Sequence, residues 1–198
     1  MIKIGITGKI GTGKTTVSKI LKLIGYKVFE SDKEVRKAFL NLEIKEKIKK
    51  QFARNIPNLF FRNGFLNRKS LGKYVFSNKN ELVILENIVH PIINQAQKLF
   101  IKNNKNDAVL FFDIPLLFEK KKYKNFDYIF YTFVEESVQK KRVLKRKEMT
   151  AKKFEKILKN QKHDLSKFRK YISLEINTIE SKEEVKKKIC IFLEKLNF

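Results

Sequence analysis

Apolar and polar residues at the start of the chain change from the period of a strand to that of a helix and back. Alternate isoleucines in segment 2–6 predict a buried strand, and apolar residues spaced by three and four in segment 14–24 predict a helix. Gly25 follows that helix, where glycine commonly ends one. Segment 26–30 predicts a second strand. A strand, a glycine-rich loop, a helix and a strand indicate a β-α-β unit, and hence a parallel sheet with a right-handed crossover.

The middle of the chain, about residues 33–104, has the apolar spacing of helices. Pro91 lies within one helical stripe and is expected to kink or divide that helix, because proline lacks the amide hydrogen that a helix interior needs. Segment 53–70 contains Pro57 and Gly64 and predicts a loop. This region is therefore expected to be a helical insert.

The second half of the chain returns to strands and helices. The predicted strands cover 108–115, 127–133 and 172–177. The first of these is an all-apolar run, which indicates a strand covered on both faces. The predicted helices cover 135–147, the residues after a cap at Thr150, and the terminal residues after a capping box at 181–184. Together with the opening unit, this order predicts an α/β fold.

Composition excludes several classes of protein. The chain has 198 residues, of which 42% are hydrophobic and 33% charged, and this indicates a globular protein of one domain. We find no apolar run of the roughly 18 residues that span a membrane, and no signal peptide. The single cysteine, Cys190, cannot form a disulfide within the chain, which predicts a reducing compartment and hence the cytoplasm. Together with His90 and His163 it is too few for a Cys/His zinc site.

The formal net charge of +24 has two explanations. It indicates either a polyanionic partner such as nucleic acid or a biased composition, in which lysine far outnumbers arginine. The lysines are spread along the whole chain and no nucleic-acid-binding motif accompanies them. We therefore favour the composition bias and do not expect nucleic acid as a partner. In either case the positive field attracts phosphorylated small molecules.

The glycine-rich loop matches a phosphate-binding pattern. Residues 8–15, GKIGTGKT, fit G-x-x-x-x-G-K-[ST], the P-loop. Glycines let successive backbone amides approach phosphate oxygens, and the following helix adds the positive end of its dipole. A chance match in an ordinary turn is the alternative, but the strand before and the helix after the loop argue against it. We predict nucleotide contacts from Gly8, Gly11, Thr12, Gly13, Lys14, Thr15 and Thr16.

The end of the loop predicts the cofactors. Lys14 is expected to reach the β- and γ-phosphates of ATP, and Thr15 to place its hydroxyl on Mg²⁺. A P-loop alone does not distinguish kinases, GTPases and motor ATPases. Segment 78–81, NKNE, has glutamate where the guanine-recognition pattern NKxD has aspartate, and this argues against a GTPase. The short chain favours a kinase of small molecules.

Motifs along nearly the whole chain resemble those of the dephospho-coenzyme A kinase family. The similar segments are GITGKIGTGKTTV (5–17), FESDKEVR (29–36), LNRKSLGKYVFSN (66–78), LENIVHPII (85–93), DIPLLFE (113–119) and VQKKRVLKR (138–146), followed by Gln161 and Asn177. Any one match would be weak. The ordered set is strong, because DIPLLFE and HPII are hard to explain otherwise.

The resemblance implies a fold and a reaction. It implies an α/β fold with a P-loop NTPase-type parallel sheet flanked by helices. Its nucleotide-binding core would cover 1–32, 105–139 and 171–198, with a helical acceptor-binding insert at 33–104 and a helical lid at 140–170. It implies ATP-dependent phosphorylation of the ribose 3′-hydroxyl of dephospho-CoA, the last step of coenzyme A biosynthesis. The sequence does not determine the oligomeric state, and we favour a monomer.

The resemblance also assigns catalytic roles. Asp32 follows the second predicted strand and is expected to accept the proton of the ribose hydroxyl; the alternative is a helix N-cap. Arg142 and Arg146 are four residues apart, so we expect both on one helix face, where they would stabilise charge on the moving phosphoryl group. The alternative for this pair is a solvated basic face.

Further positions are candidates for binding the acceptor or the base. Arg36 and Arg68 are expected at the phosphates of the acceptor, with surface ion pairs as the alternative. His90 is a candidate acceptor contact or a packing residue. Asp113 is expected to hold a Mg²⁺-bound water or to orient the acceptor, unless it only ends its strand. Asn177 is expected near the adenine.

The chain departs from the family pattern at several positions. Lys9 replaces a usual glycine, which requires backbone angles that suit a side chain. Glu30 and Lys147 replace aspartates, and Tyr171-Ile172 replaces Ala-Asp. Two other functions stay open: a P-loop kinase of nucleosides or nucleotides, and a basic nucleic-acid-binding NTPase.

Overall fold

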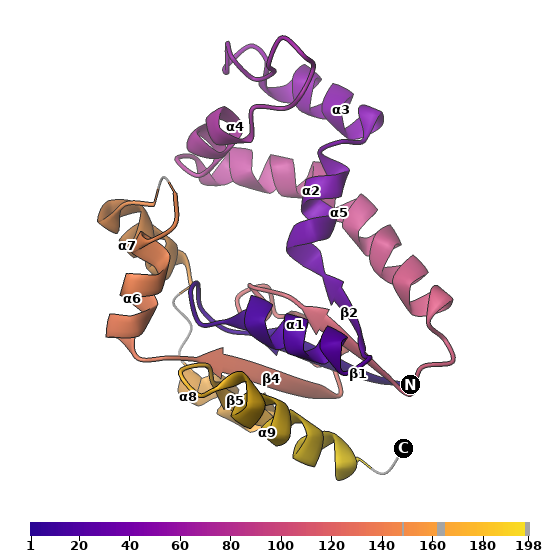
Figure 1. Ribbon diagram of the computed structural model, residues 1–198. Coiled ribbons are helices and arrows are strands. Elements are labelled where there is room, and N and C mark those ends of the chain that lie inside the picture. The colour runs from indigo at the N-terminus through magenta and orange to yellow at the C-terminus, as the bar shows by residue number, and fades with distance from the viewer. Residues whose placement is uncertain (148, 162–164, 197–198) are drawn as a thin grey trace. The chain divides into compact units, whose positions relative to one another are not determined.

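The computed structural model describes residues 1–147, 149–161 and 165–196 (Figure 1). The chain divides into two compact units. One contains Met1–Glu30 and the chain from Asn104 onward, and the other is Ser31–Asn103. His163 lies outside the described residues, as does part of the expected lid.

The first unit is built on a parallel sheet of five strands in the order β2-β3-β1-β4-β5. The strands are β1 (Ile2–Thr7), β2 (Lys27–Glu30), β3 (Val109–Asp113), β4 (Tyr128–Phe133) and β5 (Leu174–Asn177). All neighbouring pairs are parallel. The five predicted strands and the parallel sheet are therefore confirmed.

Both faces of the sheet are covered, as the apolar runs predict. Helices α1 (Lys14–Leu23) and α9 (Lys182–Glu194) pack on one face, which carries Ile6 and Phe130 (Figure 1). The opposite face carries Tyr131, which packs against residues of η1 (Lys122–Asn125), α8 (Leu165–Phe168) and η2 (Arg169–Tyr171). Burial is the main cause that raises the pKa of Tyr131 to about 12. The sheet thus holds the ends of its strands in fixed positions.

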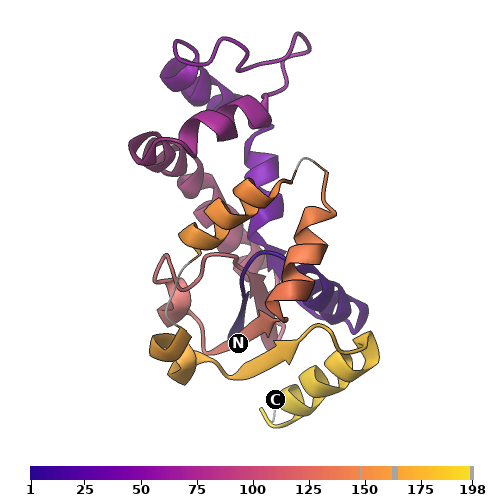
Figure 2. The same cartoon turned by 90° about the vertical axis from the view of Figure 1, so that its left-hand side faces the viewer.

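Two helices follow β4 and lie side by side, α6 (Glu136–Leu144) and α7 (Ala151–Asn160) (Figures 1 and 2). The side chain of Thr150 accepts a hydrogen bond from the backbone amide of Lys153, so the predicted cap is confirmed. The predicted capping box at Ser181 and Glu184 is also present. Helix α6 is shorter than predicted, because it ends at Leu144 rather than at residue 147.

The second unit is helical apart from its loops and one isolated bridge. Its helices are α2 (Ser31–Ala38), α3 (Leu42–Phe52), α4 (Arg68–Val75) and α5 (Lys79–Asn103). The predicted loop is confirmed between α3 and α4, although it is shorter than 53–70 because α4 begins at Arg68. A single antiparallel bridge joins Phe60 to Leu66 within it. Buried residues of α3, α4 and this loop form one apolar core, against which α5 packs.

Pro91 lies inside α5, which runs unbroken from Lys79 to Asn103. The expectation that Pro91 divides this helix is wrong. The buried residues Val89 and Ile93 lie on either side of the proline, so packing continues across the position where one backbone hydrogen bond is lost. Among the helices of the described residues, none is both long enough and apolar enough to cross a membrane.

Candidate functional site

The P-loop connects β1 to α1, as the sequence predicts, and close packing explains its glycines. Gly13 has φ of 91° and immediately precedes α1. A Cβ atom at Gly13 would lie 2.5 Å from Thr178 Oγ1, and one at Gly8 would lie 2.4 Å from the carbonyl oxygen of Thr132. The loop therefore lies against residues of β4 and of the turn after β5. Its glycines are required by these contacts as well as by the approach of a phosphate.

Lys14 is the first residue of α1 and folds back over the loop. Its ammonium donates hydrogen bonds to the carbonyl oxygens of Gly8 (2.7 Å) and Lys9 (3.1 Å). Lys121 is the one non-glycine residue of the described chain with positive φ, so the backbone at Lys9 suits a side chain. The replacement of glycine at this position is thereby explained. A cation held at the rim of a loop of amides is well placed to meet a phosphate.

Thr12 is buried in the loop, at 4% exposure. Its hydroxyl donates to the carbonyl oxygen of Lys9 (2.8 Å) and lies 2.8 Å from Thr132 Oγ1. The side chain thus serves the internal structure of the loop. Any contact of Thr12 with a nucleotide is accordingly assigned to its backbone. Thr15 and Thr16 follow in the first turn of α1, and Thr15 is exposed.

Two buried glutamines hold the middle of the loop. Gln139 of α6 donates to the carbonyl oxygen of Ile10 (2.6 Å), and the side-chain oxygen of Gln161 accepts from the amide of Ile10 (2.8 Å). Sequence reasoning assigned no role to either residue. Both residues belong to segments of the family resemblance, but their contacts with Ile10 span 129 and 151 positions of the chain, which no local pattern reveals.

Arg142 of α6 is held by Thr178. Its two terminal nitrogens donate to the hydroxyl and to the carbonyl oxygen of Thr178, both at 2.8 Å. Arg146 lies beyond the end of α6 and is exposed. The prediction that the two arginines share one helix face is therefore wrong, since the helix ends between them. Asn177 is the last residue of β5, and its side chain accepts a hydrogen bond from the amide of Ile179 (3.1 Å).

Asp113 is the last residue of β3, which ends two residues before the predicted 115 and pairs with the P-loop strand β1. It is in register with Ile6 of β1 and with Glu30 of β2. The hydroxyl of Ser18 in α1 donates to its carboxylate (3.1 Å). Glu30, which replaces the family's aspartate, forms an ion pair with Lys22. The carboxyl ends of β2 and β3 thus carry two neighbouring carboxylates.

The oxygen donors near the loop fit Mg²⁺. Magnesium is commonly bound by one or two protein oxygens together with substrate phosphates and water. A hydroxyl at Thr15 and a carboxylate at Asp113 are donors of this kind. Among the described residues, no group of three or more His, Cys, Asp and Glu side chains could hold a metal by itself. This donor set fits a metal that arrives with a nucleotide.

The second unit contains a cavity of about 510 Å³ that brings Arg36 and Arg68 together. Lys69 of α4 also lines it. Its apolar lining consists of Phe39, Leu40, Phe61, Phe65 and Leu66. Phe61 and Phe65 are more than half exposed. A cavity with three cations and exposed aromatic rings suits a ligand that carries both phosphate and apolar groups.

Asp32 and His90 also belong to the second unit. Asp32 is exposed and is the second residue of α2, so it lies within the helix rather than at the N-cap position. It follows the end of β2 by two residues. His90 is partly buried in α5, directly before Pro91.

The chain is similar to known proteins along almost its whole length. The family model described as dephospho-CoA kinase matches residues 2–174. A dephospho-CoA kinase of Fusobacterium nucleatum subsp. nucleatum is 35% identical over 192 residues, which are 96% of each chain. One from Bartonella quintana is 32% identical over 195 residues, which are 98% of this chain and 97% of the relative.

Solved structures share the fold. A crystal structure of TT1252 from Thermus thermophilus superposes with a TM-score of 0.80 at 25% identity, over 100% of this chain and 98% of the other. A dephospho-CoA kinase from Campylobacter jejuni gives a TM-score of 0.65 at 23% identity, over 98% and 96%. A shikimate kinase from Acinetobacter baumannii gives 0.57 at 15% identity, over 100% and 96%. These likenesses confirm an α/β fold of the P-loop kinase type.

Proposed function

The chain belongs to the dephospho-CoA kinase family, and from this premise we propose how its residues phosphorylate dephospho-CoA. It is an enzyme that uses ATP to phosphorylate the ribose 3′-hydroxyl of dephospho-CoA, giving coenzyme A and ADP in coenzyme A biosynthesis. The observation that carries the proposal is the P-loop between β1 and α1 in a chain that matches this family over residues 2–174.

The P-loop binds the triphosphate of ATP in this proposal. Backbone amides of the loop and of the first turn of α1 donate to the phosphate oxygens. Lys14 exchanges its two carbonyl partners for the β- and γ-phosphates. The exchange is favourable because an ammonium group binds a charged phosphate oxygen more strongly than a neutral carbonyl oxygen. Asn177, at the end of β5, contributes to the adenine site.

Mg²⁺ would be held by Thr15, and Asp113 would accept a hydrogen bond from a metal-bound water or orient the acceptor. The bound metal supplies positive charge to the phosphate oxygens. Ser18 keeps the Asp113 carboxylate oriented through its hydrogen bond. The role of Asp113 is therefore to present a fixed negative oxygen at the end of β3.

Transfer joins the acceptor oxygen to the γ-phosphorus and breaks the bond from that phosphorus to the oxygen that becomes part of ADP. Asp32 accepts the proton of the attacking hydroxyl, an effect worth on the order of 10²–10⁴ in rate. Lys14, Arg142 and Arg146 stabilise negative charge on the moving phosphoryl group.

The cavity of the second unit holds the acceptor. Arg36 and Arg68 bind its diphosphate, and the apolar lining accommodates its uncharged parts. His90 is a further acceptor contact. In this scheme 33–104 is the acceptor-binding insert, 140–170 the lid, and 1–32, 105–139 and 171–198 the nucleotide-binding core of one domain. We further propose a monomer that acts in the cytoplasm without nucleic acid.

An assay of ADP release tests the proposal. Purified protein is given ATP with dephospho-CoA, uridine or AMP, and ADP is measured by a coupled reaction. We expect turnover with dephospho-CoA, and Lys14→Met and Asp32→Asn variants that lose at least about 10²-fold in kcat. Lys19→Met, an exposed residue of the same helix, and Glu34→Gln, of the same helix as Asp32, are matched controls that keep activity. Turnover with uridine alone would contradict the proposal.

A further inference from the structure

Thr178 joins the P-loop to the arginine of α6 through a single hydroxyl. Its Oγ1 accepts a hydrogen bond from Arg142 (2.8 Å) and donates one to the carbonyl oxygen of Thr12 (2.8 Å). The carbonyl oxygen of Thr178 accepts a second bond from Arg142 (2.8 Å). Thr178 is only 7% exposed, so these bonds are shielded from water. One residue therefore fixes both a loop carbonyl and a guanidinium.

Close packing restricts movement of the P-loop relative to Thr178. A Cβ at Gly13 would lie 2.5 Å from Thr178 Oγ1, so the loop backbone lies directly on the Thr178 side chain. The Thr12 hydroxyl in turn lies 2.8 Å from Thr132 Oγ1 of β4. Thr178 itself is fixed by a bond from its amide to the carbonyl oxygen of Phe133 (3.1 Å). The sheet thus sets the position of Thr178.

We propose that Thr178 is a positioning residue for phosphoryl transfer, which sets the guanidinium of Arg142 at a fixed place relative to the P-loop. The inference rests on the proposed function, in which Arg142 stabilises charge on the phosphoryl group. A guanidinium has five N–H donors, and the bonds to Thr178 use one from each terminal nitrogen. The remaining donors are then preorganised for a phosphate, which lowers the cost of reorganisation during transfer.

A purely structural role for Thr178 makes a different prediction. If the Thr178 hydroxyl only satisfies the Thr12 carbonyl, it contributes to the stability of the fold. Removing it would then have the same effect whether or not Arg142 is present. A positioning residue acts through Arg142, so removing Thr178 should have little further effect once the guanidinium is gone. The two roles are therefore separated by combining the substitutions.

The experiment compares Thr178→Val, Thr178→Ala and Thr178→Ser in the full chain. Steady-state kinetics with ATP and dephospho-CoA, binding of a fluorescent ATP analogue and thermal unfolding are measured for each. We expect Val and Ala to lower kcat/KM for ATP by about ten-fold or more, the size that loss of a buried hydrogen bond to a charged group gives. Ser, which keeps the hydroxyl, should stay within about two-fold of the parent.

The double variant Arg142→Ala/Thr178→Ala gives the decisive comparison. We expect it to be no slower than Arg142→Ala alone. Additive losses, or an Ala variant as active as the parent, would overturn the inference. A parent protein that binds the ATP analogue but does not turn over dephospho-CoA would contradict the proposed function instead. In that case the binding measurements on the same variants still test the link between Thr178 and the nucleotide site.

Discussion

Gly13 and Gly25 show at the level of single residues how surroundings decide the role of a glycine. Their φ angles are nearly equal, 91° and 94°. A Cβ at Gly13 would lie 2.5 Å from Thr178 Oγ1, whereas a Cβ at Gly25 would meet nothing within 4 Å. Glycine is therefore required at position 25 only for its backbone conformation. At position 13 it is required for its conformation and also because a Cβ atom would clash with Thr178.

We expect Gly25→Ala to lower the free energy of unfolding by about 1 kcal/mol, the cost of a left-handed conformation for a residue with a Cβ, and to leave activity intact. Gly13→Ala should bear the same strain and also displace the loop from Thr178. Its affinity for ATP should fall by about ten-fold or more. Chemical denaturation and titration with an ATP analogue measure the two effects. Equal affinities in the two variants would contradict this interpretation of the loop.

At the level of elements, the capping box of α9 predicts a dependence on pH. Hydrogen bonds to Ser181, its backbone amide first and then its hydroxyl, lower the pKa of Glu184 in the folded protein. The charged form is therefore favoured by folding. The stability from this bond is present above the ordinary glutamate pKa of about 4.5 and is lost as pH falls through the lowered folded value.

Glu184→Gln should accordingly be less stable than the parent at pH 7, and the difference should shrink as pH falls through the lowered pKa of Glu184 in the folded protein. Glu183→Gln removes the same charge from the same helical turn and serves as the control, because Glu183 is not part of the capping box. Urea denaturation of the three proteins at several pH values measures the differences. A difference between Glu184→Gln and Glu183→Gln that stays constant with pH would contradict the explanation.

Elements with local signals were predicted well. The strands have apolar runs or alternation, α1 has a clear apolar stripe, and the caps at Thr150 and Ser181 are local patterns of side chain and backbone. The short elements η1, α8 and η2 were not predicted individually, because a single turn has no periodicity to detect.

The contacts that shape the candidate site are less accessible to sequence reasoning. The bond from Thr178 to Thr12 spans 166 positions, and that from Gln139 to Ile10 spans 129. Nothing local distinguishes these residues from other polar residues. The P-loop pattern and the family resemblance predict which residues contact the nucleotide. The residues that hydrogen-bond to the loop backbone can be identified only once the order of the strands in the sheet is known.

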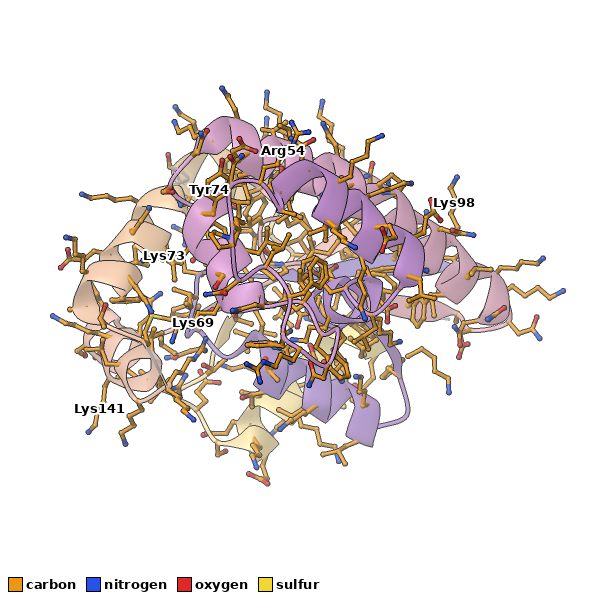
Figure 3. The ribbon with its side chains drawn as sticks, turned by 90° about the horizontal axis from the view of Figure 1, so that it is seen from above. Arg54, Lys69, Lys73, Tyr74, Lys98 and Lys141 are labelled. Carbon is orange, nitrogen blue, oxygen red and sulfur yellow. The ribbon has the colours of Figure 1, made fainter. Side chains whose placement is uncertain are left out.

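At the level of the whole molecule, the net charge of +24 produces a diffuse positive field. Its lysines occur along the whole chain, and basic side chains such as Lys98 and Lys141 are exposed in both units (Figure 3). Both proposed substrates carry phosphates, so this field raises their concentration near the protein. Salt shortens the range of such a field from about 10 Å at 0.1 M to about 3 Å at 1 M. Contacts at short range inside a bound complex are affected much less.

We therefore expect kcat/KM for ATP and for dephospho-CoA to fall several-fold between about 20 mM and about 500 mM salt, with a smaller change in kcat. Steady-state kinetics at constant pH and free Mg²⁺ measure this, with chloride and glutamate salts compared to separate ionic strength from binding of a particular anion. A short DNA duplex added at about 150 mM salt should not inhibit, because a dispersed charge lacks the continuous contacts that resist salt. Strong inhibition by DNA that weakens steeply with salt would instead indicate a polyanion-binding face. The net charge would then be explained by a nucleic-acid partner and not by biased composition.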